Sequence, residues 1–151
     1  MATTTAAITL TSADLLTDAL SLSATNTLYK AGTTVGLDQT TGITKAYLTA
    51  VTNVDIFPTL IEGSMAFAGK SSWVYICNKS EDETEYAIIT ISGNVIGKLY
   101  AGDFLWMPWS QSEDADADNL HADIELAPSV ATGMWAQWCM INEGTEYPDA
   151  V

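Results

Sequence analysis

The chain has 151 residues, 48% of them apolar, which is enough for one domain with a buried core. Its 5 basic residues are all lysines and stand against 19 acidic residues, and the net charge of -14 opposes binding to nucleic-acid phosphates or to anionic membrane surfaces. No apolar run reaches the roughly 18 residues of a membrane span. The first residues lack the basic segment of a secretory signal, so we expect neither feature.

Residues that favour strands are abundant, and short turn signals interrupt them at regular spacing. In chain order, this pattern predicts strands near residues 5–11, 18–23, 26–31, 43–51, 72–78, 84–92, 94–100, 103–109, 119–126 and 132–141. One helical turn is predicted at residues 12–16, with Ser12 as its cap. Many short strands with regular punctuation predict an all-β chain, either a sandwich or a barrel.

Two kinds of strand are predicted. Residues 120–126, LHADIEL, alternate strictly between apolar and polar, which is typical of a strand with one buried and one solvated face. Residues 84–91 and 132–141 are apolar on both faces. Because an antiparallel sheet usually has one solvated face, we expect loops or a partner subunit to cover the second face of these strands.

The sequence contains no recognisable catalytic motif. It has one histidine, no serine in a G-x-S-x-G pattern and no glycine-rich phosphate loop. Cys77 and Cys139 lie in apolar, strand-like runs and are interpreted as buried free thiols, with a disulfide as the alternative. We therefore predict that the chain is not an enzyme and needs no cofactor.

Acidic residues offer one weak candidate for a metal site. Asp114, Asp116 and Asp118 stand at alternate positions in SEDADADN, as oxygen ligands do in calcium loops. The run lacks the glycine and the glutamate of the EF-hand pattern, so an acidic solvated loop without metal is the preferred interpretation. Alternate polar side chains over residues 121–125 would lie about 6–7 Å apart, which is wide for one ion to bridge.

The tryptophans raise the question of what they contact. A sugar platform would place exposed rings among polar residues, whereas these tryptophans stand among Met, Leu, Ile and Cys, so a core or a subunit interface is favoured. The residues predicted to contact neighbouring chains are Trp106, Met107, Trp109, Trp135 and Trp138, together with Ala2, Ile8 and Leu10 in an N-terminal arm formed by residues 2–10.

Five short stretches in a fixed order carry a resemblance to a known family. They are TDALSLS (17–23), YICN (75–78) with an asparagine that opens a hairpin, ITI (89–91), LYAGDF (99–104) followed by Pro108, and DIEL (123–126). This order resembles that of small virion structural proteins of tailed bacteriophages, including marine and cyanobacterial ones.

The resemblance implies an antiparallel β-sandwich that is jelly-roll-like and has an extended N-terminal segment. Residues 1–17 would form an N-terminal arm or edge strand, 18–142 the sandwich and 143–151 a flexible tail. It further implies a virion protein that is assembled in the host cytoplasm and acts on a capsid or tail, and among these roles our first hypothesis is a capsid decoration or cement protein. We expect a homo-oligomer, with a trimer as the natural arrangement, that binds the major capsid protein or other virion proteins. The alternative is a carbohydrate-reading module of a tail fibre, or a tail or head–tail adaptor protein.

Overall fold

The computed structural model of the chain describes residues 3–13, 20–49, 52–57, 71–91, 93–109 and 123–143, and the regular elements within these ranges are all β-strands. In chain order they are β1 (Thr5–Ser12), β2 (Leu20–Thr27), β3 (Gln39–Thr40), β4 (Thr44–Leu48), β5 (Val54–Phe57), β6 (Ser72–Asn78), β7 (Tyr86–Ile91), β8 (Asn94–Tyr100), β9 (Phe104–Pro108), β10 (Ile124–Pro128) and β11 (Met134–Asn142). The strands pair antiparallel throughout. The prediction of an all-β chain with antiparallel sheets is therefore confirmed. Within the same ranges, no helix is long and apolar enough to cross a membrane.

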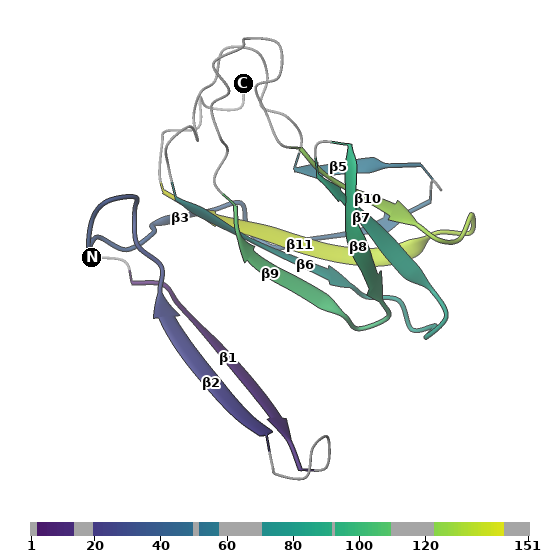
Figure 1. Ribbon diagram of the computed structural model, residues 1–151. Coiled ribbons are helices and arrows are strands. Elements are labelled where there is room, and N and C mark those ends of the chain that lie inside the picture. Colours follow the sequence, from purple (N-terminus) through teal and green to yellow (C-terminus); the bar gives the residue numbers. More distant parts are fainter. Residues whose placement is uncertain are drawn as a thin grey trace, which may run out of the picture.

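The strands form three sheets (Figure 1). The first is the hairpin β1–β2. The second has four strands in the order β5-β10-β7-β8. The third has five strands: β9 pairs with β6, β6 pairs with β11, and the far edge of β11 pairs with both β3 and β4.

The inner faces of the two larger sheets form one hydrophobic core. Val74 and Ile76 of β6 and Met134 of β11 are buried in the same apolar cluster as Ile89 of β7 and Leu126 of β10. Removal of these side chains from water is the main force that holds the sheets together. Because side chains alternate along a strand, burial of this set directs the intervening residues of each strand outward.

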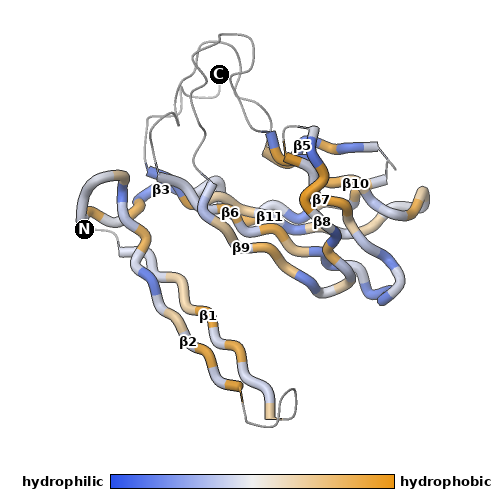
Figure 2. Tube along the Cα trace, viewed as in Figure 1, coloured by the Kyte–Doolittle hydropathy of each residue, from blue (hydrophilic) through white to orange (hydrophobic). Residues whose placement is uncertain are grey.

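The β1–β2 hairpin, which we call the arm, extends away from the two larger sheets (Figure 1). Its register pairs Ile8 with Ala24 and Leu10 with Leu22, so that the isoleucine and leucines share one face of the arm while most of the threonines and serines share the other. Apolar residues recur along both strands of the arm in Figure 2.

The base of the arm is tied to the rest of the chain. Leu28 and Leu37 are buried there, and the Leu37 N–H donates a 2.9 Å hydrogen bond to the Leu28 carbonyl. The carboxylate of Glu143 accepts hydrogen bonds from the backbone N–H groups of Ala31, at 2.9 Å, and Ser71, at 3.1 Å. These contacts join the segment that follows the arm to the start of β6 and the end of β11.

The N-terminal strands differ from the prediction. The ranges 18–23 and 26–31 are replaced by one continuous strand, β2, because Ala24 and Thr25 extend the ladder with β1. Ser12 ends β1 opposite Leu20, so its backbone belongs to a strand. Residues 14–16 of that predicted turn lie outside the described residues.

Later strands differ in smaller ways. The sequence pattern does not predict β3 and β5, which have two and four residues and therefore show too little alternation to be recognised. Of the strand predicted at 119–126, residues 119–122 lie outside the described ranges, and the described strand runs from Ile124 to Pro128.

Candidate interaction surfaces

The outer face of the five-stranded sheet is rich in aromatic side chains, and we call it the aromatic face. Since Val74 and Ile76 point into the core, their neighbours in β6 point outward, and the register places the outward residues of β9, β11 and β4 beside them. The strand residues of the aromatic face are Lys45, Tyr47, Trp73, Tyr75, Cys77, Phe104, Trp106, Pro108, Trp135, Gln137, Cys139 and Ile141.

Rings from β6 and β9 pack side by side on this face. Trp73 and Trp106 stack with centroids 5.2 Å apart and planes inclined by 22°. Tyr75 and Phe104 lie 6.1 Å apart in a tilted arrangement, and the side chain of Phe104 is 59% exposed. Because each ring is held by its cross-strand neighbour, these residues present a preformed apolar surface.

A second ring pair lies toward the β4 edge of the same face. Tyr47 and Trp135 meet edge to face, with centroids 5.2 Å apart. The Lys45 ammonium lies 5.0 Å from the centroid of the Trp135 ring, within the range of a cation–π contact. The Tyr47 hydroxyl donates a 2.9 Å hydrogen bond to the Thr132 carbonyl, which fixes the ring.

The aromatic face is nearly free of charge. Among the strand residues assigned to it, Lys45 is the one charged side chain at neutral pH. A hydrogen bond with the Cys77 side chain, together with burial, raises the pKa of Tyr75 to about 12. Burial also raises the pKa of the Cys139 thiol, so this group stays protonated at neutral pH. Cys77 is buried, Cys139 is half-buried, and both are free thiols.

A groove of about 440 Å³ lies between the arm and the aromatic face. One wall is the backbone and side chains of residues 5–9 in β1, and the other wall is Tyr75, Phe104 and Trp106. The groove is therefore lined by the uncharged parts of two different sheets and opens to solvent.

Four of the residues predicted to contact other chains lie on the two exposed apolar surfaces. Trp106 and Trp135 are on the aromatic face, and Ile8 and Leu10 are exposed on the arm. Ala2 lies outside the described residues.

The other three predicted contact residues pack inside the chain. Met107 and Trp138 point inward against the hydrophobic core. Trp109 is only 7% exposed, and its ring lies 5.7 Å from that of Phe57. We therefore leave these three side chains out of the proposed interaction surface.

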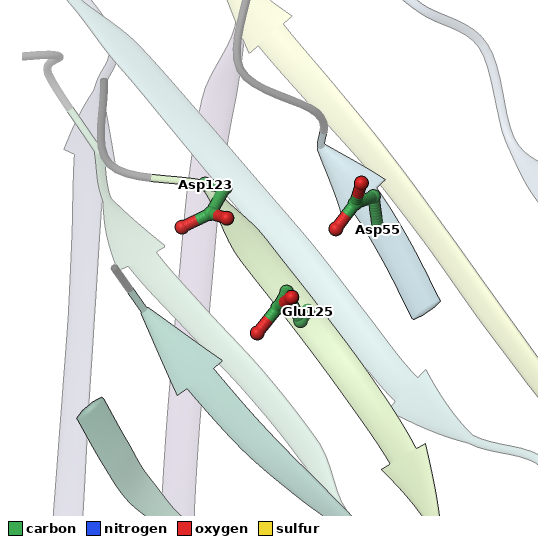
Figure 3. A group of neighbouring side chains, drawn as sticks. All are labelled: Asp55, Asp123 and Glu125. Atoms are coloured by element: carbon green, nitrogen blue, oxygen red, sulfur yellow. The ribbon is translucent and has the colours of Figure 1, made fainter. Parts of the chain in front are cut away.

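Three carboxylates gather on the outer face of the four-stranded sheet (Figure 3). Asp55 of β5, Asp123 just before β10 and Glu125 of β10 have oxygen atoms within 4.8 Å of one another. The side-chain amide of Asn53 donates a 2.6 Å hydrogen bond to Glu125. Carboxylate oxygens are the donors that Ca²⁺ takes, but a solvated acidic surface has the same composition. The predicted candidates Asp114, Asp116 and Asp118 lie outside the described residues.

Sequence reasoning missed part of the aromatic face. Tyr47, Tyr75 and Phe104 were not among the predicted contact residues, although they alternate with residues of their strands that lie in the core or pack against it. Asp55 was also missed, because it meets Asp123 and Glu125 only through the pairing of β5 with β10.

Comparison of this chain with protein-family models, curated proteins and solved structures finds no match. We therefore infer the function from the geometry of these surfaces and from the resemblance of the sequence to small virion proteins.

Proposed function

We propose that the chain is a structural subunit of a bacteriophage virion, and specifically a decoration or cement protein of the capsid. One observation carries the proposal: a strongly acidic chain presents two apolar surfaces without carboxylates, the arm and the aromatic face, to solvent. Apolar patches of this kind mark sites of association with other proteins. The order of motifs shared with small virion proteins is the reason for placing that association in a phage particle.

We further propose that the two larger sheets form a jelly-roll sandwich. The strand pairings support this because they are nested: β7 with β8, β6 with β9, β5 with β10 and β4 with β11. A long antiparallel ribbon that is folded at the β7–β8 turn and then rolled into two layers would give these pairings, and the contacts of β11 with β6 and of β10 with β7 would close the roll. Jelly rolls are common in viral shells.

The proposed mechanism is mechanical. A homo-oligomer, for which a trimer at a capsid threefold is the natural arrangement, binds the major capsid protein or other virion proteins and links adjacent shell subunits. Because it binds the assembled shell and not its separate subunits, it stabilises the shell by mass action. The net charge of -14 keeps free subunits apart in the host cytoplasm until they bind. In this proposal the chain has no catalytic role, cofactor, nucleic-acid partner or membrane partner.

A shell-binding experiment tests the function. Shells of the phage that encodes this chain, prepared without it, should bind the purified protein to saturation and lose their contents at a higher temperature once it is bound. A variant with Phe104→Asn should bind more weakly, whereas Val95→Asn, on the exposed edge strand β8, is the matched control and should bind normally. Failure of the wild-type protein to sediment with shells would overturn the proposal.

A carbohydrate-reading module of a tail fibre is the second candidate. The exposed ring of Trp135, with Gln137 beside it on β11 and Lys45 beside it on β4, supports this alternative because sugar sites combine a ring with polar groups. A glycan that quenches or blue-shifts tryptophan fluorescence in the wild type but not in Trp135→Ala would favour it. An unchanged spectrum across a glycan panel would argue against it.

A further inference from the structure

The arm is an amphipathic ribbon whose apolar side is largely exposed in the described chain. The apolar side chains on that side are Ala6, Ile8, Leu10, Leu20, Leu22 and Ala24, and Ser12 and Asn26 share it. Leu10 and Leu22 face each other across the two strands and are 54% and 52% exposed. An isolated two-stranded hairpin is marginally stable in water, so this ribbon gains stability if its apolar side is buried.

Within the described residues, nothing covers the outer half of the arm. Its base is held by Leu28, Leu37 and the Glu143 hydrogen bonds, and from there the hairpin extends away from both larger sheets (Figure 1). The groove at the aromatic face reaches only residues 5–9 of β1. Leu10 and Leu22 lie beyond this part of the arm and are exposed among the described residues, so the surface of another molecule would bury them.

The charge distribution is compatible with a second copy of the chain as that molecule. Two copies with a net charge of -14 repel each other, so they can meet only where carboxylates are absent. Strands β1 and β2 contain no charged residue, and the aromatic face contains no carboxylate. A basic partner, by contrast, would be drawn to the acidic outer face of the other sheet, where Asp55 and Glu125 lie.

The area of the arm is sufficient if every copy both donates an arm and receives one. Each arm strand has 8 residues, so the arm is about 27 Å long and roughly 10 Å wide. One docked arm then removes about 500 Å² from water, counted on both partners, which is below the roughly 1,000 Å² of a specific interface. The threshold applies to one interface, and it is reached where two copies exchange arms reciprocally, because that interface contains two docked arms and buries about 1,000 Å².

We propose that copies of this chain exchange arms reciprocally, so that the apolar side of each arm packs in the groove at the aromatic face of the other copy. The partner's arm then lies against Tyr75, Phe104 and Trp106. This inference rests on the self-association contained in the proposed function and names the two surfaces that carry it.

The test compares two double variants by light scattering after size exclusion. Leu10→Asn with Leu22→Asn changes a cross-strand pair on the apolar side of the arm. Thr11→Asn with Ser21→Asn changes the next cross-strand pair, on the hydroxyl side, and is the matched control. We expect a defined oligomer for the wild type and for the control, and a monomer for the apolar-side variant.

The receiving surface is tested separately. Phe104→Asn changes no residue of the arm, yet it should also give a monomer and should accelerate amide hydrogen exchange in β1 and β2. Dilution of the wild type should have the same effect on exchange in the arm. The exchange of β6 and β11 reports whether each variant remains folded, so that loss of the oligomer is not confused with unfolding.

The outcomes separate this inference from the proposed function. If the wild type is an oligomer and both the arm variant and Phe104→Asn keep its mass, arm exchange is wrong while self-association stands. If the wild type is monomeric at all concentrations, arm exchange is also wrong, and binding to shells decides the proposed function by itself. Monomeric test variants with an oligomeric control support the inference.

Discussion

The side-chain amide of Asn78 donates a 3.0 Å hydrogen bond to the backbone carbonyl of Leu99. Asn78 ends β6 in the five-stranded sheet and Leu99 lies in β8 of the four-stranded sheet, so the bond joins the two sheets. The Asn78 side-chain oxygen accepts a 2.8 Å hydrogen bond from the Ser80 N–H, and its backbone carbonyl accepts one from Gly102. The asparagine of the YICN motif therefore organises two turns and one contact between sheets.

Asn78→Ala should lower the free energy of unfolding by roughly 1–3 kcal/mol, because the buried Leu99 carbonyl loses its donor. Urea denaturation at a fixed protein concentration measures this. Asn78→Asp keeps the acceptor for Ser80 but removes the donor, so it should destabilise at least as much at neutral pH and recover partly in acid, where the new carboxyl group can donate. An unchanged denaturation midpoint in Asn78→Ala would show that the link contributes no stability.

The tryptophans show a limit of prediction from sequence. In β6, Trp73, Tyr75 and Cys77 alternate with Val74 and Ile76, so both faces of the strand are apolar and the alternation alone does not say which face is buried. For the same reason, the sequence does not show that Trp106 lies on the outer face whereas Trp109 lies in the core. The pairing of two sheets, which is not local information, decides it.

Long-range pairing explains the other differences as well. The composition and the turn spacing were sufficient to predict an all-β chain, and most strands lie where the pattern predicts them. The predicted contact residues of the arm include apolar residues of β1 but none of β2. Only the register, which pairs Leu10 with Leu22, shows that apolar residues of the two strands share one face. Likewise, Asp55 meets Glu125 through a sheet contact between distant parts of the chain.

Trp109 should behave as a core residue. Trp109→Ala should lower the free energy of unfolding by about 3–5 kcal/mol, because it opens a cavity beside Phe57. Trp109→Phe keeps a ring in this place and removes an indole N–H that has no acceptor among the described residues, so it should cost less than about 1.5 kcal/mol. Both values follow from urea denaturation, with Trp135→Phe on the surface as the control. A loss for Trp109→Phe as large as that for Trp109→Ala would contradict the prediction that packing of the ring carries the stability.

The acidic cluster should be a source of repulsion. The oxygen atoms of Asp55, Asp123 and Glu125 lie within 4.8 Å of one another. Two like charges at about this distance repel each other by roughly 1 kcal/mol at the dielectric constant of water. Asp55→Asn should therefore raise the melting temperature at low ionic strength, and added salt should reduce the gain. Glu83→Gln, at an exposed turn, is the control and should change little.

The effect of calcium on the melting temperature shows whether the three carboxylates only repel one another or bind a cation. If the three carboxylates bind Ca²⁺, the ion should raise the melting temperature of the wild type and a chelator should reverse this. Asp55→Asn would then be less stable than the wild type in calcium. Our expectation is the opposite: no specific calcium effect, and a gain from Asp55→Asn in either medium.

Tyr75 should ionise later than an ordinary tyrosine. Its hydrogen bond with the Cys77 side chain, together with burial, raises the pKa of Tyr75 to about 12, against about 10 for the unfolded chain. Titration of phenolate absorbance should show a late step that disappears in Tyr75→Phe and moves to lower pH in Cys77→Ala. Tyr29→Phe, at an exposed position, should retain it.

The same shift predicts how stability depends on pH. Between pH 10 and 12 the folded state holds a proton on Tyr75 that the unfolded state has released, so the free energy of unfolding falls as pH rises through this window. Below pH 10 Tyr75 is neutral in both states and contributes no slope. Tyr75→Phe should remove its part of the fall, measured by urea denaturation at pH values on both sides of the window. A titration in which every tyrosine ionises near pH 10 while the near-ultraviolet circular dichroism of the fold persists would contradict the placement of Tyr75 beside Cys77.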